Sequence, residues 1–213
     1  MRGRGGIVLA CLACLLLAWW LAHPRHTLPA PVAGPLTRAC PLPPSATMGA
    51  PPLQTDVPDG LVLPVIAGAN VTPLAGFSVA ARVLGRENYR FDAGATYSPM
   101  DLALGWGRMT DAAVLAQLQI RQSGRWYHYR WQQQPPIPVD EIVRSSANMH
   151  MVPANAEVAA ALGRIHADDR IRIDGWLVRI DARDGWHWVS SLRRDDSGNG
   201  ACELVYACAV TVL

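Results

Sequence analysis

Apolar positions follow two patterns along the chain: one unbroken run near the N-terminus, and shorter alternating stretches after residue 70. The unbroken run covers residues 7–22 and contains no charged side chain. A membrane-spanning helix needs about 17–25 residues, whereas the apolar core of a signal peptide has about 7–15. Trp20 would occupy the −3 position of a cleavage site after Ala22, where a small residue is preferred. We therefore expect residues 1–22 to be an uncleaved membrane anchor, with a signal peptide as the alternative.

Prolines are concentrated directly after this run. Eleven of the 17 prolines lie between residues 23 and 64. Proline fixes φ and has no N–H to donate, so it disfavours both helices and strand ladders. We predict that residues 23–70 form an extended tether, with plain disorder as the alternative, and that residues 71–213 form a globular domain.

Alternating apolar and polar residues predict strands in that domain. Within residues 125–131, the alternation places Trp126 and His128 on one face and the tyrosines on the other. The exposed aromatic rings could stack on a ligand, or they could simply supply bulk to the core. Gly175 predicts a bulge or bend inside its strand, and Asp184-Gly185 predicts the turn of a hairpin. The expected strands are 77–84, 125–131, 170–180, 186–192 and 202–212.

The clearest helix is expected over residues 155–165. Asn155 is a suitable N-cap, and the spacing of Val158, Leu162 and Ile165 gives the helix one apolar face. One helix followed by three antiparallel strands indicates a mostly β, α+β domain. We expect a small antiparallel, partly open barrel of the OB or SH3-like kind, preceded by the N-terminal transmembrane helix.

The charged residues bear on the class of partner and on the orientation of the chain in the membrane. The chain has 19 arginines, no lysine and a net charge of +2, which argues against a nucleic-acid partner. Without lysine there is neither a Schiff-base lysine nor a P-loop lysine.

Arg2 and Arg4 precede the apolar run, so the positive-inside rule places the N-terminus in the cytoplasm. Residues 7–22 would then cross the inner membrane once, with the domain in the periplasm.

Cysteines in such a compartment are expected to form a disulfide. Cys202 and Cys208 lie on one predicted strand, about 20 Å apart, which is too far for a bridge between them. Cys40 could pair with Cys202 or with Cys208; alternatively, the thiols are buried or pair between molecules. Outside residues 7–22 the sequence has neither a CxxC motif nor clustered histidines, so it predicts no metal site and no cofactor.

Three segments resemble a family of uncharacterised bacterial membrane-anchored or exported proteins. They are MDLALGWG at residues 100–107, SSANMH at residues 145–150 and DSGNGACE at residues 196–203. The resemblance covers roughly residues 77–210. It implies one extracytoplasmic domain in which the three segments matter together, and it implies no activity.

We expect a recognition surface where these three segments meet, because glycines allow close approach and polar side chains supply donors and acceptors. The protein would then be a non-catalytic binding or structural module of the cell envelope, with a protein or glycan partner. The alternatives are a buried polar network and an extracytoplasmic hydrolase using His150 with Ser146 or Cys202. The candidate surface residues are Trp106, Ser146, Asn148, His150, Asp196 and Glu203.

Overall fold

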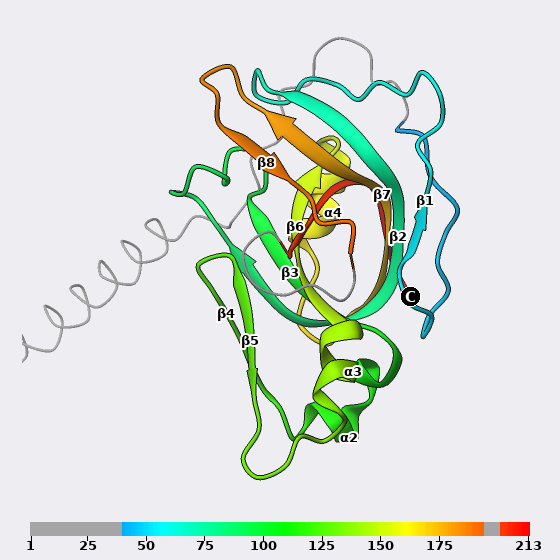
Figure 1. Ribbon diagram of the computed structural model, residues 1–213, viewed down its shortest axis with the longest axis vertical. Helices are drawn as coiled ribbons and strands as arrows, with labels where there is room; N and C mark the ends of the chain where they lie inside the picture. The colour runs from blue at the N-terminus through cyan, green and yellow to red at the C-terminus, as the bar shows by residue number, and fades with distance from the viewer. Residues whose placement is uncertain (1–39, 194–200) are drawn as a thin grey trace, which may run out of the picture.

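The chain forms a partly closed β-barrel from which a hairpin and two short helices project (Figure 1). The structure is a computed structural model that describes residues 40–193 and 201–213. In those two ranges, no helix is both long enough and apolar enough to cross a bilayer. The predicted anchor, residues 7–22, lies outside them. The elements are β1 (Leu53–Thr55), β2 (Asn70–Asn88), β3 (Met100–Gly105), η1 (Gly107–Thr110), α2 (Ala112–Leu115), β4 (Gln119–Ser123), β5 (Trp126–Arg130), α3 (Val139–Arg144), β6 (Ser146–Pro153), α4 (Ala156–Gly163), β7 (Arg170–Asp181), β8 (His187–Val189) and β9 (Glu203–Val212).

One long strand closes the sheet. The order of strands is β1-β2-β3-β6-β9-β7-β8, and β2 also pairs with β7. The first part of β2, up to Arg82, pairs with β7, and the part from Arg82 to Asn88 pairs with β3. Strands β6 and β9 run parallel, while the other neighbours in the barrel run antiparallel. The mostly β fold and the partly closed barrel agree with the sequence prediction.

Alternation along the strands, interrupted at the bulges, separates two layers of apolar residues. On β7, Ile171, Ile173 and Leu177 point into the barrel, whereas Trp176 and Val178 belong to a second cluster outside it. Both faces of this strand are therefore buried, which explains its strong apolar signal. The register with β9 shifts at Gly175, as the sequence predicted. A Cβ at Gly175 would overlap the Tyr206 carbonyl, so glycine permits this close approach.

Helix α4 packs against the interior of the barrel, and Figure 1 shows it behind the ring of strands. The Asn155 side chain accepts a hydrogen bond from the Val158 N–H at 2.9 Å, which confirms the predicted N-cap. Val158, Leu162 and Ile165 join the inner cluster, in agreement with the predicted apolar face.

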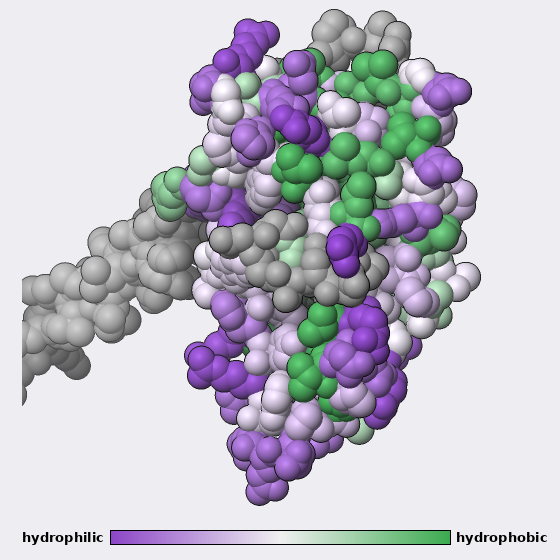
Figure 2. Space-filling view, viewed as in Figure 1, coloured by the Kyte–Doolittle hydropathy of each residue, from purple (hydrophilic) through white to green (hydrophobic). Residues whose placement is uncertain are grey.

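Residues 40–70 do not form a free tether, contrary to the prediction. β1 pairs with β2, and Leu63 and Ile66 are buried against the outer face of β7 and β9. The Ala46 N–H donates to the Ser78 hydroxyl at 2.7 Å, an interaction buried inside the fold. Because proline removes ladder bonds but does not prevent side-chain packing, composition alone misplaced this boundary. The upper part of the face in Figure 2 shows apolar residues gathered where this segment lies over the barrel.

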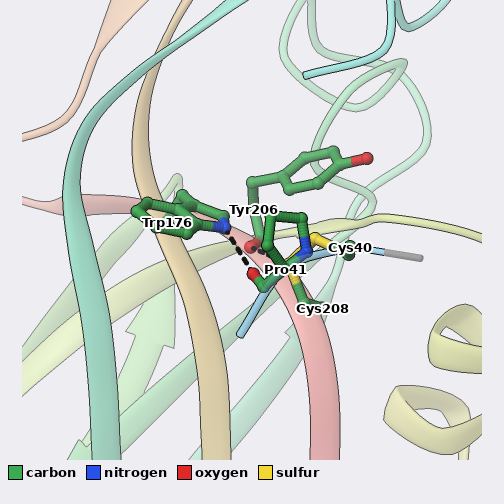
Figure 3. Close-up of a disulfide and its surroundings, with 5 residues drawn as sticks. All are labelled: Cys40, Pro41, Trp176, Tyr206 and Cys208. Carbon is green, nitrogen blue, oxygen red and sulfur yellow. Dashed lines mark hydrogen bonds between the residues drawn. A yellow bond between two sulfur atoms is a disulfide. The ribbon is translucent and has the colours of Figure 1, made fainter. Parts of the chain in front are cut away.

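A disulfide fixes the start of this segment to the last strand. Cys40 is bonded to Cys208 of β9, with the two Cα atoms 5.5 Å apart (Figure 3). Beside it the Trp176 indole N–H donates to the Pro41 carbonyl at 2.9 Å. This pairing is one of the two that the sequence left open. Residues 40–70 therefore belong to the folded domain.

The β4–β5 hairpin forms a two-stranded sheet of its own. It lies with α2 and α3 in the lower part of Figure 1. A third apolar cluster joins these elements, including Met109, Leu118 and Ile142. Tyr129 and Trp131 of the hairpin pack against that cluster, whereas Trp126 and His128 face solvent. The predicted alternation of residues 125–131 is confirmed, and the tyrosine face supplies bulk to the core.

Candidate functional site

A row of polar side chains lies on the outer face of β3 and β6. The register pairs Asp101 with His150, Ala103 with Asn148, and Gly105 with Ser146. The residues between them, such as Leu102 and Met149, point into the barrel. The segment from Ser146 to His150 is therefore part of a largely buried strand. Its alternation of polar and apolar residues is the signal that predicts this strand.

His150 and Asp101 form a buried pair across the two strands. His150 Nδ1 lies 2.9 Å from Asp101 Oδ1, with the imidazole 4% and the carboxylate 0% exposed. This separation places the two atoms within hydrogen-bond distance of each other. The His150 ring packs against Trp188 of β8, with ring centroids 4.5 Å apart. The imidazole is thus held on one side by a carboxylate and covered on another by an indole.

Arg125, at the tip of the β4–β5 hairpin, inserts its guanidinium beside this pair. Its Nη1 donates to Asp101 Oδ1 at 2.8 Å. Its Nε and Nη2 donate to the two oxygens of Asp92 at 3.1 and 2.8 Å, a bidentate arrangement. The guanidinium carbon lies 3.8 Å from the centroid of the Tyr89 ring and 5.4 Å from that of Trp188. Two carboxylates and two aromatic rings therefore surround one cation.

These contacts shift the pKa values of the surrounding groups. Burial raises the pKa of the Tyr89 phenol to about 12, and the charge of Asp101 adds to this effect. Burial also acts to raise the pKa of the Asp92 carboxyl, but the hydrogen bond and charge of Arg125 outweigh it, so the pKa lies below its ordinary value. The site therefore favours a neutral phenol and an ionised carboxylate beside the guanidinium.

Asn148 connects the strand to the hairpin. Its side-chain amide donates to Asp101 Oδ2 at 3.0 Å and to the Arg125 carbonyl at 3.1 Å. Its side-chain oxygen accepts from Gln122 Nε2 at 2.7 Å. We call Asp101, Arg125, Asn148 and His150 the polar network. Each of these four side chains has a partner within the chain, as the alternative of a buried polar network requires.

Ser146 belongs to a separate group of contacts. Its hydroxyl donates to the Ile142 carbonyl at 2.7 Å and accepts from the Tyr127 hydroxyl at 3.3 Å. Burial raises the pKa of Tyr127 to about 12. Ser146 and His150 are four residues apart on an extended strand, which separates their Cα atoms by about 13 Å. They do not form a nucleophile–base pair.

The other candidate residues lie elsewhere. Trp106 is 3% exposed and belongs to the inner core cluster, so it contributes no exposed surface. Glu203 is buried opposite Met149, which places it on the inner face rather than beside His150. Asp196 lies outside the described residues. Cys202 is half-buried, one residue before β9, and is not part of the Cys40 disulfide. Of the five candidate residues that the structure describes, Asn148 and His150 contact one shared carboxylate, that of Asp101.

Aromatic side chains lie beside the polar network on the β2–β3 loop and on the β7–β8 hairpin. The ring of Tyr97, between β2 and β3, stacks on Trp186 with centroids 5.2 Å apart, and Trp186 meets Trp188 edge-on at 5.9 Å. A Cβ at Gly94 would lie 2.6 Å from the Trp188 ring, so glycine allows the β2–β3 loop to pack closely against Trp188. Phe91 is 98% exposed on the same loop as Tyr97. We call Phe91, Tyr97, Trp186 and Trp188 the aromatic group.

The residues that the structure describes contain no cluster of three or more His, Cys, Asp or Glu side chains that could hold a metal ion. An open groove lies away from the polar network, between the end of α2 and the segment after β5. Its lining carries no titratable side chain and consists of Ala116, Gln117, Leu118, Gln119, Gln132, Gln133 and Gln134.

Sequence reasoning missed Asp101 and Arg125 as members of the site. Asp101 interrupts an apolar stretch at an outward position, which is a readable signal once residues 100–105 are treated as a strand. Arg125 carries no such signal, because its role depends on where the hairpin folds back. The sequence matches no protein-family model, and neither curated proteins nor solved structures give a significant match. Membership of the family suggested by the three segments therefore stays a prediction.

Proposed function

We propose that this protein is a non-catalytic binding module of the bacterial cell envelope, held at the inner membrane by residues 7–22 with its domain in the periplasm. The observation that carries the proposal is the contrast between the polar network and the aromatic group. The charged groups are buried and paired within the chain, whereas Phe91 projects 98% exposed from a loop beside them. A site built this way offers apolar contact and shape rather than a free nucleophile or base.

The disulfide supports the compartment. Bridges such as Cys40–Cys208 persist in oxidising spaces and are rare in the cytosol of most organisms. Because Cys40 is fixed to the barrel, only residues 23–39 separate the proposed anchor from the domain. At about 3.3–3.6 Å per residue these 17 residues span at most roughly 60 Å. The module therefore works close to the membrane surface.

The arrangement of strands supports an OB-type barrel over an SH3-like one. Numbered along the chain, the five barrel strands β2, β3, β6, β7 and β9 follow the order 1-2-3-5-4 and back to 1. The third and fifth strands are parallel, and α4 lies between the third and fourth. OB-folds bind ligands on the face of strands 2 and 3 and with the neighbouring loops. By analogy of fold, that is the face where the polar network and the aromatic group lie.

The hydrolase alternative retains only Cys202 as a nucleophile for His150, since Ser146 is engaged elsewhere. The His150 imidazole is almost fully buried between Asp101 and Trp188, so a substrate would have to displace part of this packing. We therefore favour binding over hydrolysis, and we propose a protein as the partner.

Site-specific photo-crosslinking in living cells tests this function. A benzoylphenylalanine at position 91 of the full-length chain should give a discrete adduct with an exported protein, identified by mass spectrometry. Val62 is 76% exposed in the segment before β2, and the same crosslinker there is the matched control. Trp186→Ala should weaken the adduct without lowering the melting temperature by more than a few degrees. Equal adducts from positions 91 and 62, or binding to isolated cell-wall glycan with no protein adduct, would contradict the proposal.

A reporter that is active only outside the cytoplasm tests the compartment. Fused after Leu213, it should be active, because the proposed anchor leaves the C-terminus in the periplasm. A silent reporter, together with a fluorescent cytoplasmic reporter at the same junction, would contradict the proposed topology.

A further inference from the structure

The tip of the β4–β5 hairpin holds an arginine at a position that favours glycine. Gly124 and Arg125 are the two central residues of the turn, with φ values of 58° and 72°. A two-residue turn of this kind needs positive φ at both positions, which Asn, Asp and Gly adopt most readily. A long side chain with positive φ is uncommon, because its Cβ strains the backbone there. The strain at Arg125 is offset by what its side chain contacts.

Those contacts match a guanidinium closely. Asp92 accepts from two of its nitrogens and Asp101 from a third, each at 3.1 Å or less. The Tyr89 ring lies over the flat face of the group, with Trp188 further away. A planar cation with a fork of donors satisfies this geometry, whereas a lysine ammonium has neither the fork nor the flat face. We call Tyr89, Asp92, Asp101 and Trp188 the guanidinium site.

The hairpin that delivers Arg125 is not part of the barrel sheet. β4 and β5 pair with each other and form a separate two-stranded sheet. Side chains fasten the hairpin to β6, through Gln122 to Asn148 and through Tyr127 to Ser146. Moving its tip would therefore break these contacts and those of Arg125 while leaving the barrel ladder intact.

We propose that the guanidinium site recognises an arginine side chain of the protein partner, and that Arg125 fills it within the same chain until the partner arrives. This inference rests on the proposed function, because it names the chemistry by which that face recognises its partner. The hairpin is then a lid over the outer face of β3 and β6. A partner arginine would displace Arg125 and leave the aromatic group to contact the residues around it.

The test removes the internal arginine and supplies one from outside. Arg125→Gly deletes the side chain while placing a residue suited to a φ of 72° in the turn. The probe is the peptide acetyl-Gly-Arg-Gly-amide, with the lysine peptide of the same length as control. Binding to the full-length protein in detergent is measured by isothermal titration calorimetry. Because Arg125 competes in the wild type, the variant should bind the arginine peptide about tenfold more tightly or better.

Specificity provides the matched controls. The lysine peptide should bind the Arg125→Gly variant at least about tenfold more weakly than the arginine peptide, because it lacks the planar fork. Adding Asp101→Asn to Arg125→Gly should remove most of the arginine-peptide binding. Equal affinities for the wild type and Arg125→Gly, or for the two peptides, would overturn the inference.

Two further outcomes remain decisive. If Arg125→Gly does not fold alone, refolding with the arginine peptide should recover folded protein and refolding with the lysine peptide should not; no recovery would overturn the inference. The crosslinking experiment at position 91 separates this inference from the proposed function. If position 91 of the wild type gives a protein adduct but Arg125→Gly does not bind the arginine peptide, the inferred arginine site is overturned. The proposed binding module would then still stand. If the variant binds the arginine peptide but position 91 gives no adduct, the proposed binding module is overturned. The inferred partner arginine is overturned with it, and the site then holds only Arg125 of the same chain.

Discussion

Arg125 and Asp101 meet at a single carboxylate oxygen, with Nη1 2.8 Å from the Oδ1 that also contacts His150 at 2.9 Å. Asp101 is the point at which the barrel strand, the hairpin tip and the buried imidazole are joined. Its carboxylate has no exposed surface, so its charge is balanced by these partners rather than by solvent. Removing the charge of Asp101 therefore leaves a largely buried guanidinium with one carboxylate instead of two.

Asp101→Ala should lower the free energy of unfolding by about 3–5 kcal/mol, the usual effect of breaking a buried ion pair from one side. Chemical denaturation followed by tryptophan fluorescence measures this loss. The control is Asp168→Asn, which removes a carboxylate that pairs with Arg82 but is 76% exposed. Asn tolerates the φ of 74° at this position, so the variant should cost at most about 1 kcal/mol. Similar losses for the two variants would show that the polar network contributes no more than a surface ion pair.

The disulfide should contribute strongly to stability because it closes a long loop, with Cys40 and Cys208 separated by 168 positions. Loss of a native disulfide usually costs about 2–5 kcal/mol. Cys40→Ser and Cys208→Ser should each lower the melting temperature, and the double variant should lower it no further. Cys202→Ser is the matched control and should leave the Cys40–Cys208 bridge intact in a non-reducing peptide map. A map in which Cys40 is linked to Cys202 would contradict the pairing.

Two deletions locate the start of the domain. Deleting residues 23–39 should leave the melting temperature nearly unchanged. Deleting residues 40–58 should lower it by many degrees, because β1, the disulfide and the Ala46–Ser78 contact are lost together. Differential scanning calorimetry measures both. An equal, small effect of the two deletions would restore the view that residues 40–70 are a free tether.

Acid should weaken the attachment of the hairpin through Asp92. Its pKa lies below the ordinary value of 3.8 in the folded protein, so its contribution to stability is present above that value and is lost as the pH falls through the lowered pKa. The difference in melting temperature between wild type and Asp92→Asn should be constant near neutrality and shrink below about pH 4. A difference that grows with acidity would show that the carboxyl is not held ionised by Arg125.

Hydrophobic alternation, helix capping and turn residues correctly predicted those helices and strands that depend on a few neighbouring residues. β7 and α4 lie where alternation and the Asn155 cap placed them, with ends shifted by only a few residues. Hairpin β7–β8 follows from Asp184-Gly185, where Gly185 adopts a φ of 90°. In these elements, the hydrophobic pattern and the turn residues agree about one structure.

Contacts between distant parts of the chain could not be predicted in the same way. Pro-rich composition hid the packing of residues 40–70, which depends on an apolar outer face of β7 and β9. His150 and Asn148 were recognised as polar candidates, but Asp101 and Arg125 join them only through the register of β3 with β6 and the fold of the hairpin. Register and closure are properties of the whole sheet, and no short window of sequence contains them.

The bridge between Cys40 and Cys208 also determines where mechanical tension would enter the domain. In a chain tethered as proposed, a pull between the membrane and a bound partner would reach the fold at Cys40. β1 meets β2 through only three residue pairs at the edge of the sheet and would peel away under such a load. The sulfur bond instead passes the force directly to β9, which has β6 on one side and β7 on the other. The outer face of β3 and β6, where we propose that the partner binds, would therefore keep its shape while the link to the membrane is under tension.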